Sequence, residues 1–413
     1  MTTAVGTLYP EHSAIRDGRL SIGGCDAAEL AQRYGTPLYA VAEDDLRARA
    51  REFTAAMPGE VVFASKAFPC TAVLRVFHEE GLSVDVASGG ELALAQRAGF
   101  DGPRIILHGN AKSEAELRAA TRAGARIVVD NFDELDKLER IEAPCEVMIR
   151  VTPGVVADTH AAILTGHAGS KFGFSLADAP RAIERLRASG WADLRGLHMH
   201  IGSQLFDLAP WRAAVEAIAG LGDFEAYDLG GGLAVAYTPD RRPPSVAEYV
   251  ESMVATADEV LGPGRALSIE PGRALTATAG VTLYTVESVK DVPLKDGDIR
   301  FVAVDGGMSD NLRPMLYDAP YEADLIDRVG KAGTPCTVVG KHCESGDVLI
   351  RETTLPDPKP GEVLVTPVTG AYVYAMANNY NGVPRPPVVF CSGGRAREVV
   401  RRETFEDLYG RDV

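Results

Sequence analysis

The stretch VVFASK, residues 61–66, is a short apolar run that ends in a single lysine. Pro69 follows closely, so the run predicts a buried strand that carries Lys66 at its tip. The charge of a lysine in such a place must reach water or be used. Two interpretations follow from these residues alone. Lys66 extends from the strand end into solvent, or its amine is held for Schiff-base chemistry.

Similar runs, rich in Val, Ile and Leu, alternate with amphipathic stretches that are each long enough for one helix. Alternating strands and helices imply parallel strands with right-handed crossovers. Eight such units match a (β/α)8 TIM-type barrel. A doubly wound open sheet is the alternative, but no GxGxxG turn follows the first strand, which favours the barrel. The runs lie at residues 61–64, 82–87, 104–108, 126–130, 146–151, 196–200, 226–229 and 267–270.

After Glu270 the pattern changes, because Gly, Pro and Asp turns join the apolar runs and no regular helix pattern separates them. This predicts a second, mostly-β domain of barrel or sandwich type. The run at residues 38–41 is expected to join it. The predicted domains are residues 44–274, the barrel, and residues 1–43 plus 275–413, the β domain. The runs of the β domain lie at residues 281–289, 300–305, 334–339, 362–367 and 388–391.

The composition limits the classes of function. The chain has 413 residues and a net charge of −16, which disfavours nucleic acid or an anionic membrane as a partner. No apolar run reaches the length of about 18 residues that a membrane helix needs, and residues 1–10 do not resemble a signal peptide. The six cysteines are scattered without a CxxC pair. We therefore expect a cytoplasmic protein without a structural metal site.

The predicted strand ends carry polar or glycine-rich residues, and in a barrel the carboxyl ends of the strands form one site. Gly230, Gly231 and Gly232 follow the seventh strand, where barrels commonly bind phosphate, although three glycines also suit a tight turn. Glu270 ends the eighth strand. It can keep a pyridine nitrogen protonated, or it can pair with Arg273 within its own turn.

The sixth strand end adds His200 and Ser203. His200 is suited to stack on a flat ring, or it is a hydrogen-bonded histidine at the barrel rim. Ser203 and Arg273 can add a hydroxyl group and a positive charge to a bound anion. A lysine, a phosphate cradle and an acid at one end of a barrel are the groups that pyridoxal phosphate requires.

The motifs of the whole chain, taken in order, resemble those of the fold-type III pyridoxal-phosphate-dependent decarboxylases, and most closely those of the diaminopimelate decarboxylases. The resemblance runs from the first barrel strand almost to the end of the β domain. The matching motifs are FASKAF (63–68), DVASGGEL (85–92), HGNAKS (108–113), RVTPGV (150–155), KFGF (171–174), GLHMHIGSQ (196–204), DLGGGL (228–233), EPGR (270–273), DGGMSDNLRPMLY (305–317), CESGD (343–347) and GAYVYAMANNYN (370–381).

The resemblance implies pyridoxal 5'-phosphate as the cofactor and a role for each matching residue. Lys66 would hold the cofactor covalently, His200 would stack on its ring, and Glu270 would pair with its nitrogen. The implied cofactor-binding residues are Lys66, Asp85, His200, Ser203, Gly230, Gly231, Gly232, Glu270, Arg273 and Tyr372. The implied substrate-binding residues are Arg273, Arg313, Tyr317, Glu344 and Tyr372, and the implied catalytic residues are Lys66 and Cys343.

The resemblance also implies a homodimer with shared active sites. The segment with Cys343 and Glu344 would enter the partner's site, where the cysteine donates a proton and the acid binds substrate. A buried, inert thiol is the alternative for Cys343. The implied reaction is the decarboxylation of meso-2,6-diaminopimelate to L-lysine and CO2, the last step of lysine biosynthesis. Arg273 and Arg313 suit the distal carboxylate of this substrate, and Glu344 suits its distal ammonium group.

Some residues depart from the family pattern and keep other substrates open. Ala375 and Asn378 stand where the family more often has serines, and the stretch 204–228 is short. The alternative substrates are ornithine, arginine or an intermediate of a specialised pathway. A racemase of related architecture would lack the CESGD motif. A non-catalytic pyridoxal-phosphate-binding protein would lack the β domain.

Overall fold

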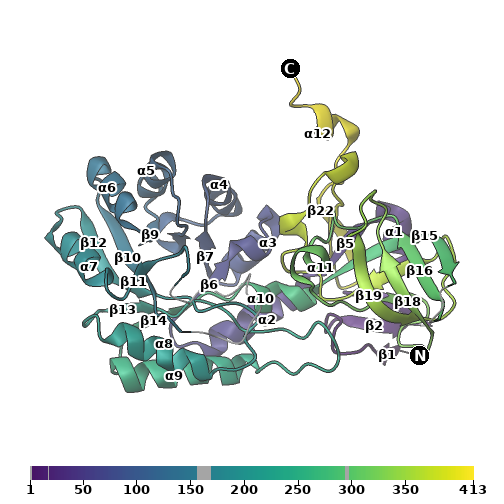
Figure 1. Cartoon of the computed structure of the whole chain (residues 1–413), viewed down its shortest axis with the longest axis horizontal. Helices are drawn as coiled ribbons and strands as arrows, with labels where there is room; N and C mark the ends of the chain where they lie inside the picture. Colours follow the sequence, from purple (N-terminus) through teal and green to yellow (C-terminus); the bar gives the residue numbers. More distant parts are fainter. Residues whose placement is uncertain (1, 17, 156–168, 294–296) are drawn as a thin grey trace. The chain divides into compact units, whose positions relative to one another are not determined.

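The computed structural model describes every residue except 1, 17, 156–168 and 294–296 (Figure 1). Its residues form two compact units. The first, which we call the barrel unit, contains Arg49–Val235 and Arg242–Ala274. The second, the β unit, contains Met1–Ala48, Ala236–Arg241 and Leu275–Val413.

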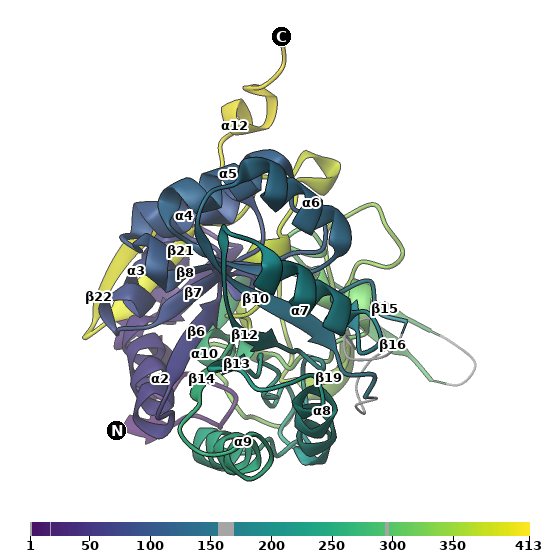
Figure 2. The ribbon, with the colours of Figure 1, turned by 90° about the vertical axis from the view of Figure 1, so that its left-hand side faces the viewer.

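Eight parallel strands close into a barrel in the barrel unit. Their order is β6-β7-β8-β9-β10-β12-β13-β14, and β14 pairs back with β6. Figure 2 shows the helices of this unit around the strands. The predicted (β/α)8 barrel is confirmed, and the open sheet is wrong. The strands are β6 Glu60–Ala64, β7 Ser83–Val86, β8 Ile105–Leu107, β9 Arg126–Val129, β10 Cys145–Thr152, β12 Ala192–His198, β13 Ala226–Asp228 and β14 Ala266–Ile269, and the short β11 Phe174–Ser175 pairs with β10.

Apolar side chains from separate strands meet inside the barrel. Val62 on β6, Ile106 on β8, Val128 on β9 and Met148 on β10 form one buried cluster. Parallel strands that are covered on both faces read as continuous apolar runs, which is why the sequence pattern predicted them well. The packed interior leaves the strand ends as the place where polar side chains can gather.

Several helices of the barrel unit, among them α4, α5, α6 and α9, begin after a residue whose side chain caps the first turn. In α5 the Ser113 side chain accepts from the Glu116 amide, while the Glu116 side chain accepts from the Ser113 amide. The helix ends at Gly124, whose φ of 70° favours glycine. Such caps satisfy backbone amides that the first turn of a helix leaves without a partner. The helices that begin in or belong to the barrel unit are α3 Thr71–Glu79, α4 Gly89–Ala98, α5 Glu114–Ala123, α6 Phe132–Ile141, α7 Ala179–Ala188, α8 Ala209–Ala219, α9 Val246–Leu261 and α10 Arg273–Thr276, and α2 Glu43–Ala56 leads into it.

The β unit is built on a sheet of order β19-β18-β16-β15-β5-β21-β22, to which β20 and β17 add by pairing with β15 and with each other. The run near residue 40 lies between β15 and β21, so its predicted place in the β domain is confirmed. The unit also has strands that were not predicted, namely β17, β19, β22 and a four-stranded sheet of β1 to β4. Its elements are β1 Thr2–Ala4, β2 Ser13–Arg16, β3 Arg19–Ile22, β4 Cys25–Asp26, α1 Ala27–Tyr34, β5 Leu38–Ala42, β15 Gly280–Val292, β16 Ile299–Val304, α11 Arg313–Tyr317, β17 Asp324–Leu325, β18 Thr334–Val339, β19 Val348–Leu355, β20 Val363–Thr366, β21 Val388–Ser392, β22 Arg395–Val400 and α12 Phe405–Tyr409.

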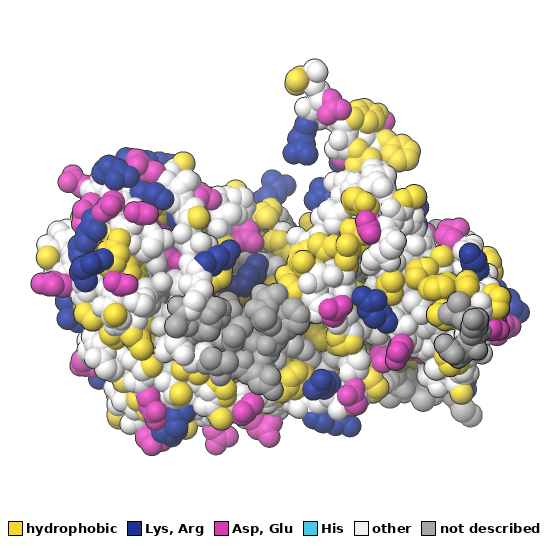
Figure 3. Space-filling model, viewed as in Figure 1, with side chains coloured by type: hydrophobic (Ala, Val, Ile, Leu, Met, Phe, Trp, Pro, Cys, Tyr) yellow, Lys and Arg dark blue, Asp and Glu magenta, His cyan; other side chains and the backbone are white. Residues whose placement is uncertain are grey.

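Lys and Arg side chains are interspersed with Asp and Glu side chains on the face drawn in Figure 3. Within the described ranges, no helix combines the length and the apolar character that crossing a membrane requires.

Candidate active site

Lys66 lies directly after β6, in a short 3-10 turn formed by Ser65–Ala67. Its Nζ atom is 3.6 Å from Oδ2 of Asp85, near the end of β7. The Lys66 side chain is 55% exposed, whereas that of Asp85 is 5% exposed. The Lys66 amine therefore lies at the carboxyl end of the barrel. It contacts the buried carboxylate of Asp85 and is still accessible to solvent.

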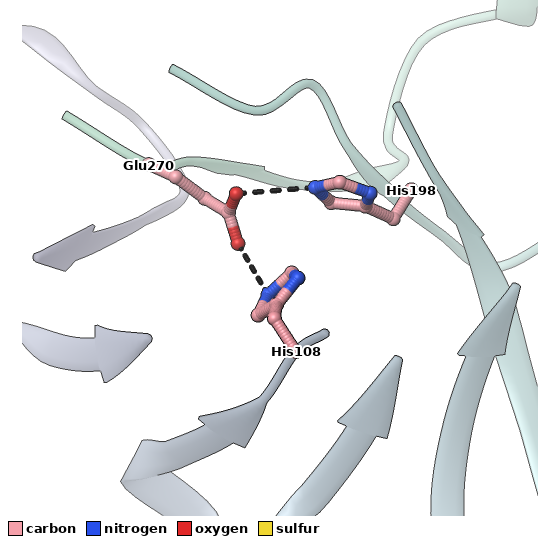
Figure 4. Close-up of side chains that lie close together, drawn as sticks. All are labelled: His108, His198 and Glu270. Carbon is pink, nitrogen blue, oxygen red and sulfur yellow. Dashed lines mark hydrogen bonds and ion pairs between the residues drawn. The ribbon is translucent and has the colours of Figure 1, made fainter. Parts of the chain in front are cut away.

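Glu270 follows β14 and lies between two buried histidines (Figure 4). Its Oε2 atom is 3.1 Å from Nε2 of His198, the last residue of β12. Its Oε1 atom is 2.7 Å from Nε2 of His108, which follows β8. The two imidazole rings meet edge to face, with centroids 4.8 Å apart. Three strand ends thus bring one acid and two bases into contact.

The charges of this trio follow from burial and from one another. Burial opposes a charge on Glu270, but His108 and His198 lower the pKa of its carboxyl group well below the usual value. Burial also opposes a charge on His108, yet Glu270 and Asp85 outweigh it and the pKa of His108 is raised. Burial lowers the pKa of His198 to about 4. These shifts favour a carboxylate on Glu270, the charged form of His108 and a neutral ring on His198.

Asp228, at the end of β13, is a second buried acid near Glu270. Burial and the charge of Glu270 raise its pKa to about 8. Its carboxyl group accepts hydrogen bonds from the amide of Gly230 and the hydroxyl of Ser268, both at 2.8 Å. Asp228 is therefore largely protonated at neutral pH, and the negative charge of this pair of acids resides on Glu270.

The glycine turn after β13 touches the loops that follow β12 and β14. A Cβ atom on Gly230 would lie 2.4 Å from the carbonyl oxygen of Met199, and one on Gly231 would lie 2.1 Å from that of Glu270. Gly230 also has a φ of 69°, in the left-handed region. Only glycine allows these three chain segments to approach so closely. The run is thus a close-packed junction at the carboxyl end of the barrel.

His200 is fixed by the same turn. Its Nδ1 atom accepts a hydrogen bond from the amide of Gly231 at 3.1 Å. Burial, and then the charges of Lys66 and Arg150, lower the pKa of His200 well below its usual value, so the ring is neutral. The amides of Gly230 and Gly231 thus both bond inside the protein, which limits what the turn itself offers an anion.

Arg273 begins α10, and its Nη2 atom donates to Oγ of Ser203 at 3.0 Å. The Arg273 side chain is buried. A guanidinium group beside a hydroxyl group suits a phosphate dianion. The ion-pair contacts of Glu270 within the described structure go to the two histidines. This argues against the alternative in which Glu270 pairs with Arg273.

Arg313, at the start of α11 in the β unit, is held by two tyrosines. Its Nη1 atom donates to the hydroxyl of Tyr321. Its guanidinium carbon lies 4.5 Å from the ring centroid of Tyr237 and 5.5 Å from that of Tyr321. Burial lowers the pKa of Arg313, but the tyrosines raise it by more. Among the described residues, no carboxylate forms an ion pair with this buried cation, so a bound anion would complete its environment.

The other predicted residues of the β unit are placed less deeply. Cys343 and Glu344 lie on an exposed loop between β18 and β19. The Cys343 amide donates to Oδ1 of Asn381 at 3.1 Å. Tyr317 ends α11 and is half-buried, and the half-buried Tyr372 has a φ of 64°. Their predicted meeting with Lys66 in one site remains a prediction.

Sequence reasoning missed several residues of these groups. His108 was predicted only as the end of the third strand and the start of a motif, without a role of its own, and His198 was not singled out. His198 and His200 are two positions apart, and alternate residues of a strand share a face, so this spacing was an available signal. Tyr237 and Tyr321 lie in no comparable pattern. Only the folded chain shows that they enclose Arg313.

The comparisons with known proteins agree with this geometry. The family model described as "Pyridoxal-dependent decarboxylase, pyridoxal binding domain" matches residues 43–277. A diaminopimelate decarboxylase from Actinosynnema pretiosum is 48% identical, over 98% of this chain and 95% of its own. One from Bacillus subtilis is 46% identical, over 96% and 95%. The crystal structure of diaminopimelate decarboxylase from M. jannaschii with L-lysine is 31% identical, covers 98% of both chains and has a TM-score of 0.89. Together with the lysine, acid and glycine turn at the barrel end, these matches show that the chain belongs to the pyridoxal-dependent decarboxylases.

Proposed function

We propose that this chain decarboxylates meso-2,6-diaminopimelate to L-lysine and CO2, with pyridoxal phosphate as its cofactor. Relatives at 48% and 46% identity carry the name of this activity, and the related M. jannaschii structure holds L-lysine. The observation in this chain that supports the substrate is the buried Arg313, which no carboxylate of the described residues neutralises. Diaminopimelate has a distal carboxylate to pair with such an arginine, whereas ornithine and arginine have none.

The residues at the carboxyl end of the barrel fit pyridoxal phosphate. The Oε1 atom of Glu270 is buried, and its contact with His108 is not aligned as a hydrogen bond. An acceptor is therefore available to a protonated pyridine nitrogen. Ser203 and Arg273 present a hydroxyl and a guanidinium group to a phosphate. The amine of Lys66 stands at the same end of the barrel.

The roles of the protein's side chains in the reaction follow from their positions. Bound pyridoxal phosphate supplies an aldehyde that binds amines covalently and a protonated ring that withdraws electrons from the breaking bond. Glu270, as an anion, keeps a proton on the ring nitrogen. His200 is neutral and fixed by Gly231, so it can lie against the ring without adding charge. The Lys66 amine would hold the cofactor covalently when no substrate is bound.

The β unit supplies the substrate-binding groups of the proposal. Arg313 binds the distal carboxylate and Glu344 the distal ammonium group, while Tyr317 and Tyr372 border the substrate. Cys343 donates the proton to Cα after CO2 has left. Cys343 and Glu344 are exposed in this chain, which supports their action in the site of a partner subunit in a homodimer. A cytoplasmic location belongs to the same proposal, because all six cysteines are unbridged.

The test is CO2 release by the purified chain with pyridoxal phosphate. Meso-diaminopimelate, lysine, ornithine and arginine are compared at equal concentrations, and the amine product is identified by mass spectrometry. We expect CO2 and L-lysine from meso-diaminopimelate alone. Release from ornithine or arginine instead would contradict the role of Arg313 and Glu344 while leaving the cofactor site intact.

A further inference from the structure

Both oxygens of the Glu270 carboxylate face a histidine, and all three side chains are buried. Figure 4 shows the imidazoles approaching the acid from two directions, on separate strand ends. A carboxylate can only accept hydrogen bonds, so the Nε2 atom of His198 that faces it must carry a proton. The tautomer of His198 is thereby fixed, with its Nδ1 atom as the unprotonated nitrogen.

We propose that His108 and His198 are positioning residues that keep the Glu270 carboxylate ionised and aimed at the pyridine nitrogen of the cofactor. This inference rests on the proposed function, because it takes Glu270 as the partner of that nitrogen. The two histidines have different roles. His108 supplies a compensating positive charge, and His198 supplies a neutral donor that fixes the plane of the carboxylate.

The charge is needed because a lone carboxylate in this environment would be protonated. Transfer of an ion from water to a buried site is costly, and an unpaired acid there becomes neutral instead. A neutral Glu270 could no longer hold a proton on a ring nitrogen. The imidazolium of His108 at 2.7 Å offsets the cost of burying the anion. His198 cannot do so, since its ring stays neutral at neutral pH.

Other charged groups face the trio from the neighbouring strand ends and influence its titration. Asp85 lies on β7 and favours the charged form of His108, whereas Asp228, at the end of β13, adds to this effect only in its ionised form. Arg150 on β10 opposes a charge on His198. Lys66 lies after β6 and opposes a charge on the neighbouring His200. Any measured pH dependence therefore has to be compared between matched variants.

The same three groups also have the donor atoms that a metal ion would need, since one donor atom from each lies within 4.8 Å of the others. Each imidazole, however, already contacts its own oxygen of Glu270, as expected of an acid held between two bases. A cation placed among them would also compete with a protonated ring nitrogen for the carboxylate. The two histidines can therefore hold the Glu270 carboxylate without a metal ion.

The first test uses the cofactor-free protein and the nuclear magnetic resonance of its imidazoles. We expect the pKa of His108 to lie above its usual value of 6.5 in the parent chain. In Glu270→Gln the anion is gone, so the pKa of His108 should fall below that of the parent. An unchanged pKa of His108 in Glu270→Gln would overturn the proposed pairing.

The second test compares two glutamine substitutions in the holoenzyme. Glutamine can donate a hydrogen bond but carries no charge, so His108→Gln removes the charge, whereas His198→Gln replaces one neutral donor by another. We expect His108→Gln to lower kcat by about ten- to a hundredfold, the range for losing a hydrogen bond to a charged group. His198→Gln should change kcat by less than about threefold, and His198→Leu by more than His198→Gln.

Two readouts separate positioning from a general loss of structure. In His108→Gln we expect weaker binding of pyridoxal phosphate and a visible absorbance of the bound cofactor that changes at a different pH from that of the parent. The control is His78→Gln, because His78 lies on α3 and packs edge-on against Phe100. It should match the parent in each readout. Circular dichroism checks that every variant is folded.

The outcomes distinguish this inference from the proposed function. If the parent chain decarboxylates and His108→Gln keeps its kcat, cofactor affinity and absorbance profile, the positioning role is wrong while the proposed function stands. If the parent chain neither binds pyridoxal phosphate nor releases CO2, the proposed function is wrong and the inference is overturned with it.

Discussion

Arg313 donates a hydrogen bond to the hydroxyl group of Tyr321, and the two residues are only 5% and 3% exposed. The second tyrosine, Tyr237, lies edge to face with Tyr321, with ring centroids 5.3 Å apart. The guanidinium group is thus orientated by aromatic neighbours that bring no formal negative charge. A planar group held this way can bind a carboxylate through two parallel hydrogen bonds.

Substituting this arginine by lysine should weaken substrate binding. In Arg313→Lys a point charge replaces the planar fork, so a bidentate contact with the distal carboxylate is lost. We expect KM for meso-diaminopimelate to rise by about ten- to a hundredfold with a smaller change in kcat. Steady-state CO2 release measures both constants.

The matched control is Arg300→Lys, because Arg300 pairs with the exposed Asp291 at 2.7 Å on the surface of the same unit. It should leave KM unchanged. If Arg313→Lys has the KM of the parent, Arg313 does not bind the substrate, and the main support for a distal carboxylate is removed.

Lys66 should be indispensable for turnover, because its amine is the covalent anchor of the cofactor in the proposal. We expect Lys66→Ala to show no measurable CO2 release. Borohydride reduction of the parent holoenzyme, followed by peptide mass spectrometry, should find the cofactor on the peptide with Lys66. The exposed Lys359, which pairs with Asp357 at 3.4 Å, provides the control variant Lys359→Ala with full activity. A cofactor label on another lysine would refute the assignment.

The barrel could be predicted from the sequence because its strands are buried on both faces and read as apolar runs. The β unit was predicted less completely. β19, with the sequence VLIRETTL, has polar and partly exposed residues in its middle, and β22, RAREVV, has no fully buried residue and lies at the end of its sheet. Polar residues interrupt the apolar run by which a strand is recognised in a sequence. Their pairing depends on partners far along the chain.

The candidate site, like the fold, could be predicted from the sequence only in part. Lys66, His200 and Glu270 stand at strand ends, which the barrel topology brings to one edge, so the sequence could predict their proximity. The contact of Glu270 with His108 and His198 depends on side-chain directions across the barrel interior. Motif spacing carries no information on which of several polar groups at one edge contact each other.

The proposed sharing of sites between subunits predicts complementation. Lys66→Ala and Cys343→Ala are each expected to be inactive or nearly so. When the two variants are unfolded, mixed in equal amounts and refolded with cofactor, half of the dimers should be hybrids with one intact site. Activity should therefore recover to about a quarter of that of the parent. Each variant refolded alone is the control. No recovery in verified hybrid dimers would contradict a site that combines Lys66 and Cys343 from different chains.

Lys112 and Glu134 form a buried ion pair of the barrel unit, with Nζ 2.5 Å from Oε1. Lys112 also donates to the carbonyl oxygens of Gly109 and Val128 at 2.7 and 2.8 Å, so it ties the loop after β8 to β9. Burial lowers the pKa of Lys112 and raises that of Glu134, and in each case the charge of the partner opposes the shift, so each group helps to keep the other ionised. Removing one partner leaves the other buried without its counter-charge.

We therefore expect Lys112→Met to lower the free energy of unfolding by about 3–5 kcal/mol. The double variant Lys112→Met/Glu134→Gln should be more stable than this single variant, because no unpaired charge remains. The new amide oxygen can still accept from the Asp130 amide, which bonds Glu134 at 2.9 Å in the parent. Urea unfolding followed by circular dichroism measures the changes. The exposed helical pair of Arg118 and Glu114 provides the control, and Arg118→Ala should have a much smaller effect. If the double variant is less stable than Lys112→Met, the unpaired charge is not what destabilises the single variant.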